Sequence, residues 1–412
     1  KKIDPKILEL IQLINELQKQ LYFQRDNAVN RTVLANDNLE LSFQGKSLFG
    51  GNSKFKAILP KFQQKLEEVR DLTNQVLFEL YNEQERMLAN VEVLVNEITE
   101  QIDRLDYYSE KGYQLADLLS DQKGLEQDGF ILMITNPDDP LSTNLDWLML
   151  DAGEVLKQIY SRFDHIAFVS ATLTSNRNFE YAINQLALTE LHPVEYIGKS
   201  TFNIKKHLQV LAVNNMPSPD SEEFEKTIAQ ILLSDIQDKH HVLVLMTNLE
   251  KIKTVFTMIM NEPQLKDFEI LAQGLSGSNN RIAKRFVIAK KSIIIGADSF
   301  WEGIDFHDCG IDTVFAAKIP FESPDQPEVR LRQKKLEDQG IDSFTKDSLP
   351  RAVIRFRQGM GRLIRGEQDH GQFVILDPRL WTKDYGQEFL QTIPVKVEKV
   401  TREELKKKLE NK

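Results

Sequence analysis

From about residue 125 onward, short apolar runs alternate with longer stretches whose apolar residues recur at helical spacing. Such alternation indicates repeated strand–helix–strand units and a parallel sheet with helices on both faces. In a sheet of this kind, functional residues lie on the loops at the carboxyl ends of the strands. The expected strands are residues 130–134, 166–169, 208–213, 242–246, 268–272, 292–295, 313–317 and 373–376, and the expected helices include 152–163, 222–236, 249–260 and 281–289.

Residues 1–120 have a different pattern. An apolar stripe with steps of three, four and seven runs from Phe62 to Leu105, which predicts a long amphipathic helix or a helical hairpin. We expect this stripe to form a helix–helix core and not a cofactor site. Between residues 27 and 53, glycines and scattered polar residues are compatible with either a short β excursion or a loop.

Composition narrows the class of protein. A chain of 412 residues is long enough for two or three domains, and 41% hydrophobic and 28% charged residues are ordinary for a globular protein. Cys309 is the single cysteine, which excludes an internal disulfide or a cysteine-held metal cluster and fits a reducing compartment. No apolar run reaches about 18 residues, so no membrane span is expected. Because the chain begins at Lys1, we interpret it as a piece of a longer protein.

The formal net charge of −10 counts against a protein that binds nucleic acid, but basic residues are concentrated locally. One cluster consists of Arg351, Arg355, Arg357, Arg362 and Arg365, and a second lies between residues 281 and 291. Local basic surface of this kind can bind phosphates on an otherwise acidic protein.

The first candidate site is the arginine-rich stretch near residue 360. Gln358, Arg362 and Arg365 are four and three residues apart, so on a continuous helix they share one face. Guanidinium groups on a fixed face suit phosphate oxygens, because each donates paired hydrogen bonds and stays charged. The alternative is a helix that simply faces solvent. Gly359 and Gly361 argue against it, because a glycine inside a helix costs about 1 kcal/mol and suggests a close approach of the backbone to another group.

A second candidate site follows the expected strand 292–295. The loop from Gly296 to Asp305 contains two glycines, two aromatic residues and three carboxylates. Glycine lets the backbone come close to a ligand, and Asp305 can accept hydrogen bonds from ribose hydroxyls or pair with the arginines. A strained turn around a buried Trp301 explains the aromatic residues but not the spacing of Glu302, Gly303 and Asp305.

Polar side chains also end two other expected strands. Ser170 and Thr172 follow strand 166–169, where they either relay hydrogen bonds between a nucleotide site and a nucleic-acid site or cap the next helix. Thr247 and Asn248 follow strand 242–246, where they hold a phosphate or, for Asn248, cap the helix that starts at residue 249. For each of these two pairs of residues, the sequence alone does not decide between the two roles.

In order and spacing, these motifs resemble motifs III to VI of superfamily 2 helicases. The sequences SATL at 170–173, SFWEGID at 299–305 and QGMGRLIR at 358–365 look like those of the DinG branch, which is related to XPD. KIPF at 318–321 and ILDPRL at 375–380 add to a resemblance that covers roughly residues 125–385. It implies an α/β fold: a RecA-like motor domain with a parallel sheet and helices on both faces, preceded by a mainly α-helical, arch-like region.

The resemblance also implies a division of the chain and roles for its residues. Residues 1–120 stand where the family inserts its arch, 121–200 correspond to the C-terminal end of the first RecA-like motor domain, and 201–412 to the second. The implied catalytic residues at the γ-phosphate are Arg362 and Arg365, the implied nucleotide-cleft residues are Gln358, Gly303, Asp305 and Glu302, and the implied single-stranded DNA contacts are Ser170, Thr172, Thr247, Asn248, Gln273 and Ser276. For Phe300 and Trp301, base stacking and buried packing are both open.

ATP and Mg²⁺ are the implied cofactors of the intact protein, and we expect no metal site in this chain. A phosphate-binding loop needs the pattern Gly-x-x-x-x-Gly-Lys-Ser/Thr, and both Gly-Lys-Ser triplets, at 45–47 and 198–200, lack its first glycine. No Asp-Glu dipeptide is present, so an acidic box is missing as well. We therefore expect this piece alone to hydrolyse essentially no ATP. Because the chain has a single cysteine, we also expect it to hold no iron–sulfur cluster.

Two hypotheses for function follow. The first is the C-terminal helicase module of a DinG-like, ATP-dependent DNA helicase that couples ATP hydrolysis to movement on single-stranded DNA. The second is a nucleic-acid-binding module that does not unwind DNA and regulates a 3′–5′ exonuclease domain on the same polypeptide. Both imply a cytoplasmic protein without membrane association, with single-stranded DNA and the missing N-terminal part of the same protein as partners.

Overall fold

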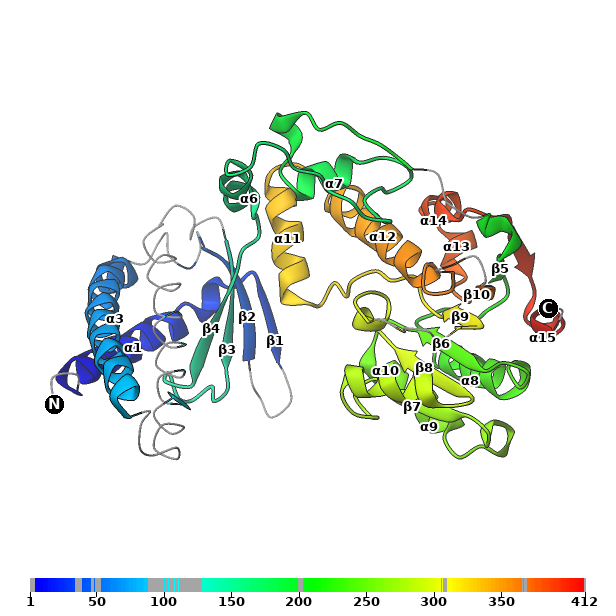
Figure 1. Cartoon of the computed structure of the whole chain (residues 1–412), viewed down its shortest axis with the longest axis horizontal. Coiled ribbons are helices and arrows are strands. Elements are labelled where there is room, and N and C mark those ends of the chain that lie inside the picture. Colours follow the sequence, from blue (N-terminus) through cyan, green and yellow to red (C-terminus); the bar gives the residue numbers. More distant parts are fainter. Residues whose placement is uncertain are drawn as a thin grey trace. The chain divides into compact units, whose positions relative to one another are not determined.

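The computed structural model describes residues 4–33, 39–45, 53–87, 128–198, 203–304, 310–364 and 369–410, together with single positions between these ranges. The chain forms two compact units (Figure 1). The N-terminal unit comprises Lys1–Ala152 and Pro324–Lys335, and the C-terminal unit comprises Gly153–Ser323 and Leu336–Lys412.

The N-terminal unit is built on a four-stranded sheet in the order β1-β2-β3-β4, whose neighbouring strands are all antiparallel. Helix α1 packs against helix α3, as the apolar stripe from Phe62 predicts for its described part. The elements are α1 (Asp4–Tyr22), β1 (Asn30–Val33), β2 (Leu39–Gln44), α3 (Ser53–Met87), β3 (Gly129–Ile134) and β4 (Thr143–Leu148).

The core of this unit differs from the expected organisation. Of the two possibilities for residues 27–53, the β excursion is the one observed, because β1 and β2 lie there. Strand β3 was expected in the parallel sheet, and this prediction is wrong, because β3 runs antiparallel between β2 and β4. The buried side chains that it shares with β2 and the helices explain this: Leu41, Phe43, Phe130 and Leu132 form one core with Leu17 and Phe62. The two compact units divide near residue 152. The division of the chain at 120 and 200 stays a prediction.

The C-terminal unit is a seven-stranded sheet in the order β11-β5-β10-β9-β6-β8-β7, and all of its paired strands are parallel. This confirms the predicted α/β class, and six of the expected strands lie in this sheet. The strands are β5 (Leu208–Val213), β6 (His241–Leu245), β7 (Glu269–Ala272), β8 (Ser292–Gly296), β9 (Thr313–Ala316), β10 (Gly371–Ile375) and β11 (Val397–Val400).

Helices cover both faces of this sheet, as predicted. Alternate residues of a strand enter different cores: Val210 of β5 belongs to the core under α10 and α12, and Leu211 to the core under α8, α9 and α15. The helices of this unit are α6 (Gly153–Tyr160), α7 (Glu180–Gln185), α8 (Glu222–Asp235), α9 (Leu249–Ile259), α10 (Asn279–Ile288), α12 (Leu349–Met360), α13 (Arg379–Thr382), α14 (Gly386–Thr392) and α15 (Arg402–Glu410), while α11 (Pro327–Asp338) begins in the N-terminal unit.

Residues 166–169 do not form the strand that their apolar character predicts. A strand is stabilised by hydrogen bonds to a neighbouring strand, and the described part of the chain places no strand beside this segment. Its side chains are exposed instead, with Val169 at 92%. The strand prediction is therefore wrong for the structure of this chain.

Candidate nucleotide and nucleic-acid site

The loop after β8 is anchored by two buried aromatic side chains. Phe300 and Trp301 are 0% and 1% exposed, and Nε1 of Trp301 donates a hydrogen bond to the carbonyl oxygen of Met246 at 2.7 Å. Of the two roles open for these residues, buried packing is the one observed. Gly303 has a φ of 89°, and, apart from its two chain neighbours, no heavy atom of the described residues lies within 4 Å of the position that its Cβ would take. The backbone is open at this glycine, which suits the close approach of a ligand.

Helix α12 approaches this loop closely at Gly359. A Cβ at this position would lie 2.5 Å from Cε3 of Trp301, so no larger residue fits without a shift of the ring or the helix. The close approach predicted for Gly359 is confirmed, although the group that it approaches is a tryptophan of the same unit. At Gly361 the nearest atoms to a Cβ are 3.4 Å away, so the predicted close approach is not observed there.

Arg362 lies just beyond α12 and is held by the loop after β8. Its Nε donates to the carbonyl oxygen of Trp301 at 3.3 Å, and its Nη1 donates to the carbonyl oxygen of Ile304. The prediction that Gln358 and Arg362 share one face of a continuous helix is wrong, because α12 ends at Met360. Instead, carbonyl oxygens of the loop fix the guanidinium beside the open backbone of the same loop.

The remaining predicted residues of the nucleotide site are placed only in part. Gln358 lies in the last turn of α12, half-buried, and its Oε1 has no hydrogen-bond partner among the described residues. Arg365 and Asp305 lie outside the described residues.

Arg355 lies beside the candidate site, and the motifs did not single it out. Its guanidinium, with the side chain 19% exposed, lies 3.5 Å from Asp298, 3.3 Å from Glu302 and 4.0 Å from Glu322. Arg355 therefore joins α12 to the loop after β8 and to the segment after β9. In the sequence, only its membership of the arginine cluster at 351–365 pointed to Arg355. The spacing of the cluster did not distinguish it from the neighbouring arginines.

Several residues that were expected along nucleic acid make local contacts. The side chain of Asn248 accepts from the backbone N–H groups of Glu250 and Lys251, so it is the N-cap of α9, and the capping alternative is the one observed. Thr247 is half-buried beside it. Oε1 of Gln273 accepts from Ala297 N at 2.7 Å.

The turn after β7 is closed by its own hydroxyl group. Oγ of Ser276 accepts a hydrogen bond from Ala272 N at 3.0 Å, and Gly274 and Gly277 have φ values of 79° and 108°. This compact turn and the loop after β8 are tied together, because Nδ2 of Asn279 donates to Oγ of Ser299 at 2.9 Å. The predicted site residues that follow β6, β7 and β8 thus lie on loops at the carboxyl ends of these strands. Because the strands are parallel, these loops lie along one edge of the sheet.

Ser170 and Thr172 lie on a segment that α12 holds in place. Their hydroxyl groups are 3.4 Å apart, and the segment does not cap a helix directly. Arg357 of α12 donates to the carbonyl oxygen of Ala171 at 3.0 Å and to Oγ1 of Thr174 at 3.1 Å, as well as to the carbonyl oxygen of Thr174. Burial lowers the pKa of the Arg357 guanidinium from its ordinary value, but arginine remains charged at neutral pH.

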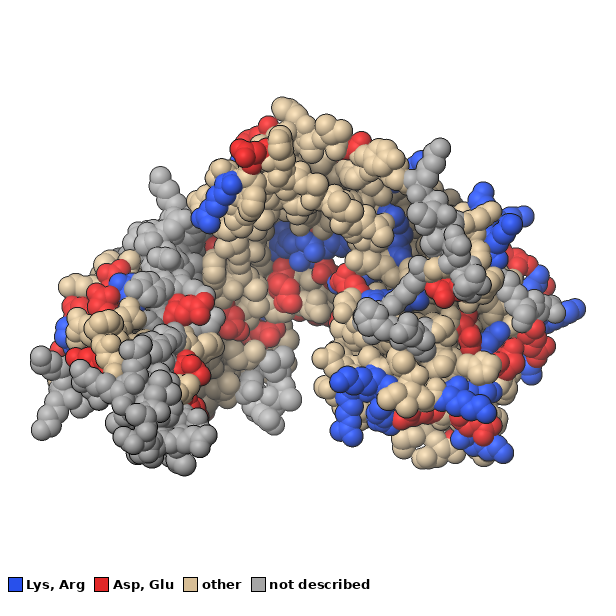
Figure 2. All heavy atoms as spheres, in the orientation of Figure 1, with Lys and Arg blue, Asp and Glu red and all other residues tan. Residues whose placement is uncertain are grey.

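Charges of both signs cover the visible face of the C-terminal unit. Lys and Arg side chains lie among Asp and Glu side chains there, and do not form one uninterrupted basic face (Figure 2). Long-range attraction of phosphates is weak on such a surface.

Comparison with known proteins gives the class of this unit. Residues 232–396 match the helicase C-terminal domain family. They take in most of the parallel sheet, the loop after β8 and the whole of α12. This part of the C-terminal unit is thus similar to helicase C-terminal domains.

Two bacterial proteins are similar to this chain in sequence. The chain is 33% identical over 251 residues to the 3′–5′ exonuclease DinG of Bacillus subtilis (strain 168), a match that covers 60% of this chain and 27% of the relative. It is 31% identical over 241 residues to the 3′–5′ exonuclease DinG of Staphylococcus aureus (strain USA300), covering 58% of this chain and 26% of the relative. The chain thus spans about a quarter of the length of these relatives.

The fold agrees with this assignment. A solved structure named XPD_APO has a TM-score of 0.51 at 14% sequence identity, covering 94% of this chain and 74% of that chain. The matches to the helicase C-terminal domain family and to the DinG relatives confirm the resemblance inferred from the motifs.

Two further observations concern metals and membranes. Among the described residues, no group of three or more His, Cys, Asp or Glu side chains is placed to hold a metal ion. None of the helices within the described ranges is long and apolar enough to cross a membrane.

Proposed function

We propose that this chain is the C-terminal module of an ATP-dependent motor that moves on single-stranded DNA. The observation that carries the proposal is the position of Arg362, which the carbonyl oxygens of Trp301 and Ile304 hold beside the open backbone of Gly303. A guanidinium that is fixed in advance next to accessible backbone suits the stabilisation of charge on transferred phosphate, because no reorganisation is needed during the reaction.

The residues present fit one side of an ATP site. ATP supplies the phosphoanhydride bond that is broken. In this chain, Arg362 stabilises negative charge on the phosphate oxygens, and Arg365 is proposed to act with it. Gly303 admits the nucleotide, with Asp305 at the ribose, Gln358 supporting the arginines and Glu302 holding the loop through Arg355. The described residues offer no cluster for Mg²⁺, so the metal is proposed to be held by another part of the intact protein.

We propose that single-stranded DNA passes over the loops at the edge of the sheet. Ser170, Thr172, Thr247 and Asn248 remain the proposed contacts, together with the turn that carries Gln273 and Ser276. The side chains of Asn248, Gln273 and Ser276 already bond to the backbone. Their proposed role is therefore to shape the loops, so that backbone groups and the remaining side chains contact the DNA.

The partner of this module is proposed to be another part of the same protein. Residues 153–198 expose an unusual number of large apolar side chains, and a solvent-facing apolar surface of this kind marks an interaction site. They are Val155, Ile159, Phe163, Ile166, Phe168, Val169, Leu191, Val194, Tyr196 and Ile197, from 38% to 97% exposed. We propose that the remainder of the first motor domain, to which residues 121–200 are assigned, packs on this surface and supplies the strand neighbours that residues 166–169 lack.

A second function is favoured by the names of the relatives, which are 3′–5′ exonucleases. In this alternative the module binds nucleic acid and regulates a nuclease on the same polypeptide without separating strands. An assay of the intact protein on a tailed duplex distinguishes the two. The motor predicts strand separation that requires ATP. The regulatory module predicts that ATP changes the rate of nucleotide release while the duplex remains paired, and this result would overturn the first proposal.

A further inference from the structure

An exposed ion pair lies at the edge of the parallel sheet that also carries the proposed DNA contacts. Lys318 follows β9, and its Nζ donates a hydrogen bond to Oδ1 of Asp220 at 3.2 Å. Asp220 lies on the loop after β5, and its side chain is 81% exposed, so solvent reaches the carboxylate. Such a pair contributes little free energy, because water screens the charges. Another anion can therefore take the place of the carboxylate.

A buried carboxylate positions the cations at this place. Asp377 follows β10, is 1% exposed, and accepts a hydrogen bond from the backbone N–H of Ile319 at 2.8 Å. This bond fixes the chain next to Lys318. Asp377 also accepts from Nε and Nη2 of Arg379, at 2.9 and 2.6 Å. A guanidinium carries five N–H donors, so Arg379, whose side chain is 22% exposed, keeps donors beyond those bonded to Asp377.

Asp220 is the exposed carboxylate in a group of three cations. The hydrogen bond from Lys318 lowers the pKa of Asp220, and the positive charges of Lys318 and Arg379 act in the same direction. The charge of Lys251 adds a smaller contribution. Lys251 pairs with the buried Glu225, and Arg379 pairs with the buried carboxylate described above. Asp220 is thus the counterion of this group that a ligand from solvent can displace.

The order of the strands connects this place with the proposed DNA contacts. Thr247 follows β6, which lies between β8 and β9 in the sheet, and β10 lies on the other side of β9. Neighbouring strands are about 5 Å apart, so Lys318 follows a strand one spacing from β6, and Arg379 follows a strand two spacings from it. A DNA strand that lies along this edge over the loops after β7, β8 and β6 contacts the loop after β9 next.

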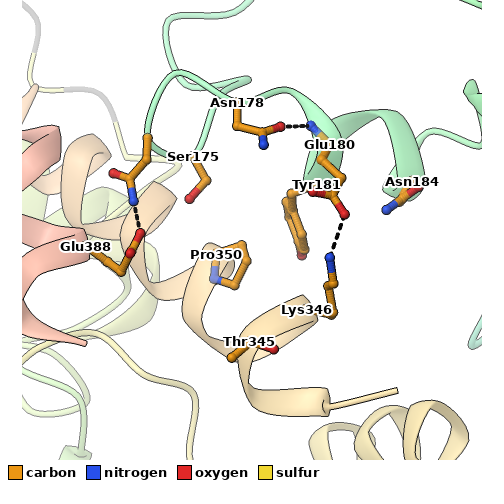
Figure 3. Close-up of a pocket in the computed structure, with 10 residues that line it drawn as sticks. Ser175, Asn178, Glu180, Tyr181, Asn184, Thr345, Lys346, Pro350 and Glu388 are labelled. Carbon is orange, nitrogen blue, oxygen red and sulfur yellow. Dashed lines mark hydrogen bonds and ion pairs between the residues drawn. The ribbon is translucent and has the colours of Figure 1, made fainter. Parts of the chain in front are cut away.

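A second exposed lysine–carboxylate pair has a different environment. Lys346 and Glu180 are 2.7 Å apart in the wall of a pocket of about 190 Å³ (Figure 3). Among the described residues, Lys346 is the one cation that lines this pocket, whereas Glu180 and Glu388 both contribute carboxylates. A phosphate is therefore disfavoured there. At Lys318, by contrast, a second cation lies beside the pair.

We propose that Lys318 and Arg379 bind a phosphate group of the single-stranded DNA, and that Asp220 occupies the place of this phosphate when DNA is absent. The inference rests on the proposed function, because it requires DNA along this edge of the sheet. The ammonium group supplies a point charge, and the guanidinium supplies hydrogen bonds of fixed direction. Asp220 is then an internal competitor that weakens the binding of DNA.

The test measures binding of a fluorescent oligothymidine to the intact protein by anisotropy at several salt concentrations. Asp220→Asn removes the charge of the competitor and is expected to strengthen binding about twofold to fivefold, because an exposed ion pair no longer has to be broken. The matched control is Asp238→Asn. Asp238 also pairs with a lysine, Lys239, at 3.4 Å, but it precedes β6 and so lies at the opposite edge of the sheet. This control is expected to keep the original affinity.

A second pair of variants tests the cation. Lys318→Gln is expected to weaken binding and to reduce the slope of log K against log salt by about 0.7, the value for one phosphate contact on a single strand. In this background, Asp220→Asn should strengthen binding less than it does when Lys318 is present. Lys290→Gln, which changes an exposed lysine before β8, serves as the control and should keep the slope.

An equal effect of Asp220→Asn and Asp238→Asn would overturn the inference, and so would an unchanged salt slope in Lys318→Gln. Either result leaves the proposed function standing as long as the unsubstituted protein binds oligothymidine. If the unsubstituted protein does not bind this strand, the proposed function fails, and the inference fails with it.

Discussion

Gly359 lies so close to Trp301 that a Cβ on residue 359 would be 2.5 Å from Cε3 of the indole. The same indole donates a hydrogen bond to Met246 at the end of β6. Trp301 therefore connects α12, the loop after β8 and β6, three elements that carry proposed site residues.

The substitution Gly359→Ala is expected to destabilise the C-terminal unit by about 1–3 kcal/mol, because the new methyl group overlaps a ring that is itself fully packed. Urea-induced unfolding followed by circular dichroism measures the change. The matched control is Gly361→Ala, where φ is −65° and the nearest atoms are 3.4 Å from the new Cβ. This control is expected to be neutral or slightly stabilising. Equal effects of the two substitutions would contradict the packing described here.

Removal of the Arg357 side chain is expected to loosen residues 171–178. The guanidinium donates to Ala171 and Thr174, and hydrogen bonds from a charged group contribute about 1.5–3 kcal/mol. Hydrogen exchange at the amides of Ser175 and Asn178 should accelerate about tenfold or more in Arg357→Ala. Arg281→Ala, which changes an exposed arginine of α10, serves as the control. Unchanged exchange in Arg357→Ala would show that this arginine does not hold the segment.

Arg355→Ala is expected to destabilise the loop after β8, because it leaves the carboxylates of Asp298, Glu302 and Glu322 near one another without their shared cation. Glu302→Gln should be mildly destabilising with Arg355 present and stabilising without it, since like charges then repel. A double-mutant cycle of unfolding free energies measures this coupling, expected at about 0.2–1 kcal/mol because Glu302 is 43% exposed. Additive effects of the two substitutions would rule out the interaction.

Much of the C-terminal unit follows from the sequence. Buried parallel strands are apolar on both faces, and Ile293, Ile294 and Ile295 of β8 show this pattern directly. The same rule failed for residues 130–134 and 166–169. Apolar runs of this length do not reveal the direction of a neighbouring strand, nor whether a neighbour is present in the chain.

The site was predictable in its residue types more than in its geometry. The motifs predicted Arg362 as a candidate, and its role stays a prediction. The spacing on an ideal helix placed it wrongly, because α12 ends at Met360. Arg355 was missed because its ion pairs join residues that are far apart in the sequence. Glu302 lies 53 residues and Asp298 57 residues before Arg355. Only the fold brings those side chains together.

ATP hydrolysis by the intact protein with Arg362→Ala tests the central proposal most directly. The account predicts a fall in turnover of about 10³-fold or more, as expected when an arginine that stabilises transferred phosphate is lost. Because Arg362 also donates to the loop, the urea midpoint of the variant must show that it remains folded, and Arg281→Ala should keep the original rate. An unchanged rate in folded Arg362→Ala would contradict the assignment of Arg362 to the phosphate chain.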